Sequence, residues 1–473
     1  MVYEKVIMSV SVSIPSWVTE EFKYLVLPDK RLETRAQIML SDQYAFPEKT
    51  IYSSAHDEAA AKGAYRFQKN PTISEELLLQ AHYDCVLERA GRHSIVLGVH
   101  DTTTLNFSSQ SQKEDTGTLQ TEESRVFLLH PLVLFSPDKL CLGVIDTNLW
   151  SRDPQEFGKS KDRSNRPIEE KESYRWLLSY RQLAETQSRL KNTEMVSVSD
   201  AESDIYDLFV EAQSHSQGPT LLVRASHNRS LEEDVQKLWP YMESHRSSFE
   251  IELEIPRKAK QPARTSQARV TYAPVTLKAP SQKQGDSVEL YAVYVRELDP
   301  PEGVEAVSWM LLTTRRIRKP KQGLMLIKWY AARWSIEIFF KTLKTSCRIL
   351  KDQTQKIGRF PITLAFKLIL TWRIMYLTHL GRECPEISSQ EAFEEAEWRA
   401  LWCYCHKTPH SPYAPPSLQE ATKMLARLGG YKQWKKNQVP EPQTLAKGLS
   451  ILTAITDMWR IMNQKESMPE IYL

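Results

Sequence analysis

The 473-residue chain lacks the features that mark membrane and secreted proteins. It contains no uninterrupted apolar run of the ~18 residues that a membrane-spanning helix needs. Its apolar N-terminal patch, Val6–Ile14, has neither a basic flank nor a small-residue cleavage site, so we expect no signal peptide. Its 6 cysteines are scattered without a CxxC pair, which favours a reduced, cytosolic protein over a disulfide-linked or zinc-binding one.

The chain also lacks a strong excess of charge. Its 62 lysines and arginines against 59 aspartates and glutamates leave a formal net charge of +3. Any binding of nucleic acid must therefore rest on local basic surfaces rather than on bulk charge. The hydrophobic content of 41 % and charged content of 26 % are those of an ordinary globular protein. A chain of this length predicts about two to four domains rather than one simple core.

Two apolar runs in the middle of the chain end in an aspartate. Ile95–Val99 leads to Asp101, and Met195–Ser199 leads to Asp200. Such runs are typical of strands buried on both faces, and in mixed α/β sheets sites assemble where strands end. The predicted elements are strands at Ile95–Val99, Arg125–Phe135 and Leu140–Ile145, a helix at Pro167–Thr186, a strand at Met195–Ser199, a helix at Asp204–Ala212 and a strand at Leu221–Arg224.

Residues 230–314 change to a period-2 pattern with turns rich in Pro, Gly, Ser and Asp, which predicts an antiparallel β insertion after the fifth strand. Basic runs without an acid occur at Arg257–Arg269 and at Arg315–Lys321. Each run alone is typical of a solvated loop, but two of them on one element favour contact with phosphate.

Both ends of the chain are predicted to be helical. The N-terminal residues read as short helices that carry Arg, Lys and Tyr, which fits either a DNA-reading module or a solvated lead-in. Near the C-terminus, Ile362–Leu380 predicts a core helix, and Leu418–Leu428 and Leu445–Met462 predict two more. The last of these has an amphipathic stripe that could pack within its own domain or against a partner subunit.

Leu324–Ile357 contains no Gly or Pro and predicts one long helix. At about 100° per residue, Tyr330, Arg333, Glu337 and Lys344 fall within a stripe of ~60° on one face. A carboxylate between two cations and a phenol suits a site that holds metal and phosphate together. The ordinary alternative is a solvated face with an i,i+4 pair between Arg333 and Glu337, and the helix by itself favours that alternative.

Three acids become candidates for metal binding: Asp101, Asp200 and Glu337. Carboxylates can bridge two metal ions that activate a water or 3′-hydroxyl and stabilise the leaving oxygen. Hard oxygen ligands suit Mg²⁺ or Mn²⁺ better than zinc. Asp146, which follows the run Leu140–Ile145, and Asp204 are rival candidates.

The helix motif resembles the signature of a known family. Tyr330, Arg333, Glu337 and Lys344 reproduce the spacing Tyr-(2)-Arg-(3)-Glu-(6)-Lys of the insertion-sequence-four family of DDE transposases, and the chain is most similar to the transposon-five (insertion-sequence-fifty) branch. Ala201 departs from the family, which usually has Arg after the second aspartate. Further segments resemble the family in the same order: Gly63–Pro71, Asp101–Leu105, Glu170–Ser173, Asp200–Asp204, Trp309–Thr313 and Ala426–Gly430.

The resemblance covers nearly the whole chain and implies its fold and metal site. It implies an α/β fold with an RNase H-like core, a mixed five-stranded sheet with flanking helices that carries the antiparallel β insertion. The implied domains are a helical DNA-binding domain at 1–75, the catalytic domain at 76–385 and a helical dimerisation domain at 386–473. Asp101, Asp200 and Glu337 would bind a pair of Mg²⁺ ions, for which Mn²⁺ can substitute.

The resemblance also implies residues that contact DNA. Tyr330, Arg333 and Lys344 would contact the phosphate backbone near the transposon end, Arg333 in bidentate fashion and Lys344 as a point charge. Trp309 would stack on a base flipped out of the duplex, which lowers the cost of unstacking it. Further implied DNA contacts are Arg224 at the end of the fifth strand, and Arg35 and Arg66 in the N-terminal helices.

The implied activity is cut-and-paste transposition through a hairpin intermediate. A homodimer would assemble on double-stranded DNA in a synaptic complex, with no membrane involved, and each active site would cut the end bound mainly by the other subunit. Two alternatives from other classes stay open. One is a regulator that binds DNA without catalysis, and the other is a structure-selective nuclease with the same core.

Overall fold

The computed structural model describes residues 14–107, 126–152, 166–215, 217–232, 236–255, 262–281, 283, 285–351, 359–433 and 439–464. These residues form two compact units. The first combines the described parts of Met1–Cys85 and Phe339–Leu473, and the second combines those of Val86–Ser108 and Thr116–Ile338. The predicted basic run at Arg257–Lys260 lies outside the described residues.

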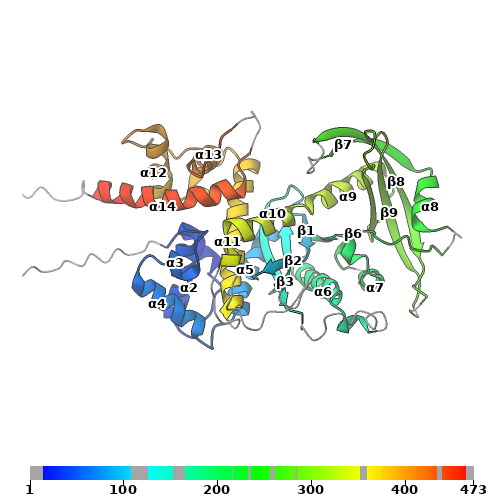
Figure 1. Cartoon of the computed structure of the whole chain (residues 1–473), viewed down its shortest axis with the longest axis horizontal. Helices are drawn as coiled ribbons and strands as arrows, with labels where there is room; N and C mark the ends of the chain where they lie inside the picture. Colours follow the sequence, from blue (N-terminus) through cyan, green and yellow to red (C-terminus); the bar gives the residue numbers. More distant parts are fainter. Residues whose placement is uncertain are drawn as a thin grey trace, which may run out of the picture. The chain divides into compact units, whose positions relative to one another are not determined.

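Within the described residues, a mixed sheet of ten strands organises the second unit, in the order β2-β3-β1-β5-β6-β10-β9-β8-β7 with β4 on β3 (Figure 1). Strands β1, β5 and β6 run parallel to one another, and the other pairs are antiparallel. The strands are β1 (Ile95–His100), β2 (Thr103–Asn106), β3 (Val126–Phe135), β4 (Cys141–Trp150), β5 (Glu194–Ser199), β6 (Thr220–Arg224), β7 (Ser248–Ile255), β8 (Arg264–Leu277), β9 (Val288–Glu297) and β10 (Ser308–Thr313).

The five predicted core strands correspond to β4-β3-β1-β5-β6, which is the strand order of an RNase H-like core. The sequence did not predict β2, because Thr103–Asn106 is short and polar. The predicted insertion is antiparallel, as expected. It is not a separate sheet, however, because β10 pairs with β6 and thereby extends the core sheet to β7.

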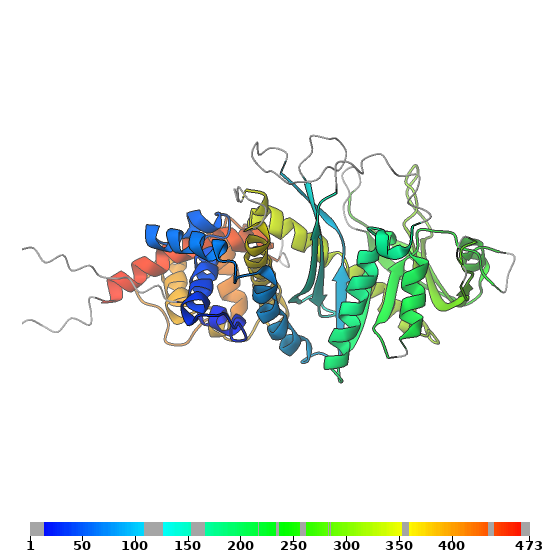
Figure 2. The ribbon, with the colours of Figure 1, turned by 90° about the horizontal axis from the view of Figure 1, so that it is seen from below.

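Helices cover both faces of this sheet (Figure 2). On one face lie α6 (Tyr174–Arg189), α7 (Tyr206–Ser214) and α8 (Leu238–Ser244), and on the other lies α9 (Pro320–Ala332). Trp176 and Tyr180 of α6 are fully buried in the core of the first face. Gly98 of β1 permits the close approach of α6, because a Cβ atom at this position would lie 2.8 Å from both methyl groups of Leu183.

The predicted single helix over Leu324–Ile357 is wrong. The α-helical segments are α9 and α10 (Ser335–Lys341), and a π-helical turn follows at Thr342–Ser346. Between α9 and α10, the N–H groups of Arg333 and Ile336 donate to carbonyls three residues earlier, which tightens the turn. No breaker residue causes this interruption. It falls at Arg333, whose side chain makes a tertiary contact described below.

The first unit is helical, with α1 (Ser16–Glu21), α2 (Lys30–Ala45), α3 (Ile51–Ser54), α4 (Glu58–Lys69), the start of α5 (Glu75–Ala90), α11 (Phe360–Glu383), α12 (Glu395–His406), α13 (Leu418–Leu428) and α14 (Pro442–Gln464). Its predicted core helix is confirmed as α11. This helix is long and apolar enough to cross a membrane by composition, but 89 % of its apolar window is buried within the protein. Lys367 inside α11 is satisfied by the carbonyl oxygens of Pro47 and Lys49.

We predict that Gly98→Ala destabilises the protein by about 1–3 kcal/mol, because the added methyl group overpacks the contact between β1 and α6. Urea unfolding measures the change. A matched control is Gly323→Ala in α9, where the nearest atom to a new Cβ is 3.6 Å away and a helix gains up to about 1 kcal/mol from the replacement. Equal stabilities for the two variants would contradict the packing argument.

Candidate active site

The parallel pairing of β1 with β5 brings two aspartates to one edge of the sheet. The register places Val99 opposite Val198, so the carboxyl ends of both strands lie side by side. Asp101 follows β1, and Asp200 follows β5, where its side chain caps a short 3₁₀-helix by accepting a 2.9 Å hydrogen bond from the Glu202 N–H. The structure therefore places these two candidate acids at the same edge of the sheet.

Asp101 is the most strongly perturbed acid of the site. Its side chain is buried, and this burial is the main reason that its pKa is raised to about 6. The negative charges of Asp200 and, less strongly, Glu337 raise its pKa further, whereas the Thr102 N–H and the Arg333 guanidinium oppose the rise. The three acids therefore interact electrostatically, with Asp101 at the centre.

Arg333 lies between two of these carboxylates. Its Nη1 is 2.9 Å from Asp101 Oδ2 and 3.6 Å from Glu337 Oε1. In this arrangement the described residues contain no group of three His, Cys, Asp or Glu side chains close enough to hold a metal ion. The donor set nevertheless fits a hard divalent cation, since all three candidates offer carboxylate oxygens. A bound cation would take over the charge compensation that Arg333 now supplies to Asp101.

Three further predicted residues gather beside Arg333. Arg224 ends β6, and its positive charge acts on the phenol of Tyr330. Trp309, half-buried on the neighbouring β10, packs edge-on against the Tyr330 ring at 5.9 Å between centroids. Burial is the main reason that the pKa of Tyr330 is raised, and the Arg333 and Arg224 charges oppose it. The Tyr330 phenol thus lies against the Trp309 indole and experiences the charges of Arg333, Arg224 and Asp200.

The two rival acids have other surroundings. Asp204 is fully buried, and its carboxylate accepts hydrogen bonds from Arg229 and from the backbone N–H groups of Ser226 and His227. It therefore anchors the segment after β6. Contrary to the prediction, Asp146 does not end a strand, because β4 continues to Trp150. Burial raises the pKa of Asp146. The pairing of β3 with β4 has a register shift at this point.

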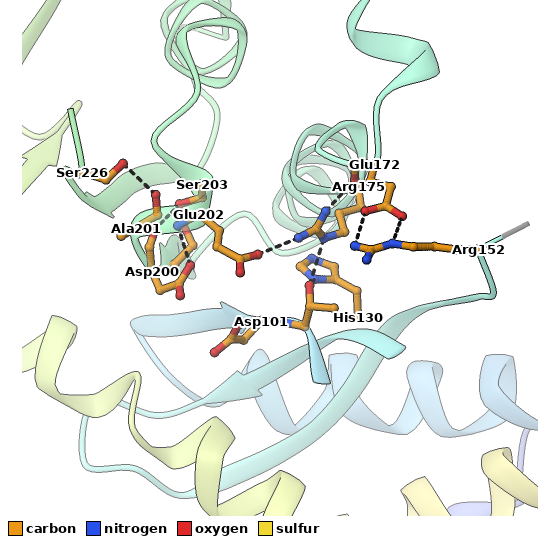
Figure 3. A network of polar contacts seen from close by, with 12 residues as sticks. Asp101, His130, Arg152, Glu172, Arg175, Asp200, Ala201, Glu202, Ser203 and Ser226 are labelled. Atoms are coloured by element: carbon orange, nitrogen blue, oxygen red, sulfur yellow. Dashed lines mark hydrogen bonds and ion pairs between the residues drawn. The ribbon is translucent and has the colours of Figure 1, made fainter. Parts of the chain in front are cut away.

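Sequence reasoning missed Arg175, a cation behind the two aspartates. It lies on α6 and contacts Thr102 and Glu202, which flank the candidate acids (Figure 3). The sequence feature that could have pointed to Arg175 is the segment Glu170–Ser173, which carries the family resemblance and immediately precedes α6. Ala201, where the family usually has Arg, contributes its backbone oxygen to a 3.1 Å hydrogen bond from Ser226 Oγ.

The remaining predicted DNA contacts belong to the first unit. The Arg35 guanidinium packs against Gly63, where a Cβ atom would lie 2.5 Å from it. Arg66 lies on α4, one residue after Tyr65, whose ring is flanked by Lys69 at 4.3 Å and Arg359 at 4.9 Å. Lys344 lies in the π-helical turn after α10, which belongs to the first unit.

Sequence families match both helical ends of the chain. The family described as Transposase DNA-binding matches residues 14–73, and the one described as Transposase Tn5 dimerisation domain matches residues 369–465. These two matches support a Tn5-like transposase of the insertion-sequence-four family. In this Tn5-like transposase the α/β unit with its mixed sheet stands between a helical DNA-binding region and a helical dimerisation region in the sequence.

A solved structure that resembles this Tn5-like transposase is the cryo-EM structure of the piggyBac transposase synaptic complex with hairpin DNA. The sequence identity is 9 %, the match covers 97 % of this chain and 79 % of that one, and the TM-score is 0.38.

We predict that Asp101→Asn stabilises the metal-free protein at pH 7 by about 1–3 kcal/mol. The folded-state pKa of about 6 lies above the ordinary value of 3.8, so the folded protein binds the proton more tightly and loses stability as the pH rises between these values. Thermal unfolding in the presence of a chelator, from pH 4 to pH 8, measures the difference, which should vanish toward pH 4. Asp299→Asn, at an exposed position, is the control; a pH-independent difference for Asp101→Asn would refute this account.

Proposed function

We propose that this Tn5-like transposase is an active cut-and-paste enzyme in which Asp101, Asp200 and Glu337 are the catalytic carboxylates. The observation that carries the proposal is the electrostatic coupling of Asp101 to the other two acids at the shared edge of β1 and β5. The family membership supplies the reaction class, since a transposase must cleave DNA at the element's ends and join those ends to target DNA.

The three carboxylates would hold a pair of Mg²⁺ or Mn²⁺ ions. When bound, such ions activate the attacking oxygen and stabilise the leaving oxygen of a phosphoryl transfer. The chain's own contribution is to keep the acids together against their mutual repulsion. Arg333 does so in the protein alone, and its 2.9 Å contact with Asp101 is the one that a cation would replace.

Once released from Asp101, Arg333 can turn its guanidinium to a DNA phosphate, for which the planar fork gives two parallel hydrogen bonds. Tyr330 and Arg224 lie beside it to extend this contact along the backbone. Trp309 offers a half-buried indole next to Tyr330, on which a flipped base would stack during hairpin formation. Lys344 completes the proposed phosphate contacts, and Arg35 and Arg66 would read the terminal inverted repeat.

The last helix supports a homodimer. Leu445, Leu449 and Leu452 of α14, which belong to the predicted amphipathic stripe, are buried within their own chain. A second apolar stripe, Ile451, Met458, Ile461 and Met462, is 39–65 % exposed. At about 100° per residue it lies on the opposite side of the helix. Because this helix falls inside the matched dimerisation region, the exposed stripe is the proposed contact with a second copy.

We expect Asp101→Ala, Asp200→Ala and Glu337→Ala each to abolish Mg²⁺-dependent cleavage of the cognate transposon end. The end is first identified by selection from random duplexes in Ca²⁺, and binding in Ca²⁺ should survive each substitution because the phosphate contacts remain. Asp146→Ala, which removes a half-buried strand acid elsewhere in the sheet, is the matched control and should still cleave. Cleavage by any of the three variants would rule out the triad, and cleavage without joining by the wild type would indicate a nuclease.

We predict that Ile461→Glu and Met458→Glu weaken self-association of the end-bound protein, since a charge on the exposed stripe would be buried in the dimer without a partner. Sedimentation velocity with end DNA measures the dimer fraction. Tyr413→Glu, at a residue that is 98 % exposed outside α14, should leave that fraction unchanged. An undiminished dimer in both α14 variants would show that the contact lies elsewhere.

A further inference from the structure

Arg175 joins the segments that follow β1 and β5. Its Nε donates a 2.9 Å hydrogen bond to Thr102 Oγ1, and its Nη2 lies 2.8 Å from Glu202 Oε2 (Figure 3). Its Nη1 donates at 2.7 Å to the backbone oxygen of Glu172 on its own side of the sheet. The guanidinium therefore has all three of its nitrogens engaged, with one contact on each active-site segment.

Both contacted residues hold a candidate catalytic carboxylate through the backbone. The Thr102 N–H donates to Asp101 Oδ1 at 2.7 Å, and the Glu202 N–H donates to Asp200 Oδ1 at 2.9 Å. Each aspartate thus accepts a main-chain hydrogen bond from a residue whose side chain is bound to Arg175. The guanidinium links the two carboxylates without touching either of them.

The surroundings of Arg175 favour one fixed position. Its side chain is only 10 % exposed, and its guanidinium packs against the Trp176 and Trp150 rings at 5.2 and 5.6 Å. On the far side, Arg152 makes a bidentate ion pair with Glu172.

A buried histidine completes this setting. His130 Nδ1 lies 2.9 Å from Thr102 Oγ1. Burial keeps the pKa of His130 well below its ordinary value, so the ring is neutral, and the Thr102 hydroxyl that accepts from Arg175 donates to it. The neutral His130 ring therefore adds no positive charge next to the Arg175 guanidinium.

We propose that Arg175 is a positioning residue that sets the spacing between Asp101 and Asp200, and thereby the affinity of the site for divalent cations. The proposal rests on the proposed function only for the identity of the two carboxylates. Like-charged groups that repel each other need a framework that resists their separation, and a single buried guanidinium with a contact on each segment provides it. A merely structural role predicts lost stability without a change in metal affinity.

The test compares Arg175→Gln with Arg181→Gln in the full-length protein. Arg181 lies on the same helix and makes a similar bidentate ion pair, with Glu211, but has no link to the aspartates. Free Mn²⁺ is titrated by electron paramagnetic resonance, without DNA. We expect Arg175→Gln to weaken Mn²⁺ binding about 10- to 100-fold, as loss of an orienting partner does at other metal sites. Arg181→Gln should bind Mn²⁺ as the wild type does, and Arg175→Lys should recover part of the loss.

A second measurement needs no metal. Hydrogen exchange of the amides of Thr102 and Glu202 should accelerate in Arg175→Gln and not in Arg181→Gln, because the bonds to the aspartates loosen. Thr102→Val, which keeps the backbone N–H and removes the hydroxyl, should weaken Mn²⁺ binding in the same direction, and adding it to Arg175→Gln should cost less than the sum of the two. Wild-type Mn²⁺ affinity in Arg175→Gln, or equal losses in the two arginine variants, would overturn the proposal.

Failure of this inference can be told apart from failure of the proposed function. Asp101→Asn should abolish the Mn²⁺ signal if the carboxylates form the metal site. If it does, an unchanged affinity in Arg175→Gln refutes only the positioning role. If Mn²⁺ binding is unaffected by Asp101→Asn, the assignment of the triad fails, and with it the premise for Arg175.

Discussion

The repulsion between Asp101 and Asp200 is the constraint on which the site depends. Parallel pairing of β1 and β5 forces the two strands to end together, so the acids that follow them cannot separate without disturbing the sheet. The raised pKa of Asp101 records part of that cost. Two arginines reduce the cost of this repulsion in different ways. Arg333 reaches Asp101 directly from the turn after α9, and Arg175 acts through the residues next to the acids.

This arrangement makes the site a compromise between the stability of the fold and the proposed function. A buried carboxylate with a pKa of about 6 is less favourable for the folded state at neutral pH than an ordinary one. The same feature would suit the proposed metal ligand, which would exchange a proton or Arg333 for a divalent cation. Asp204 shows the contrast, since its carboxylate is fully satisfied by Arg229 and backbone N–H groups and is committed to structure.

The sequence was informative where local pattern and burial agree. The apolar runs of β1 and β5 are buried along nearly their whole length, so their ends, and the aspartates there, could be located. The sequence was uninformative where tertiary contacts determine where a helix or strand ends. Nothing local marks the turn at Arg333, and β4 extends beyond its apolar run into a polar half that ends at Trp150. Arg175 was not among the predicted site residues, because its partners Thr102 and Glu202 come from two distant segments.

The fusion of the insertion with the core sheet has a mechanical consequence. Asp200 follows β5, Arg224 ends β6 and Trp309 lies on β10, and these three strands are consecutive neighbours in one hydrogen-bonded ladder. The strands of Asp200 and Trp309 are therefore two ladder steps apart, about 10 Å. The sheet therefore fixes the spacing between the Asp200 carboxylate and the Trp309 indole. Because a hydrogen-bonded sheet resists shear, a duplex that made both proposed contacts would adapt its own shape to this spacing rather than change it.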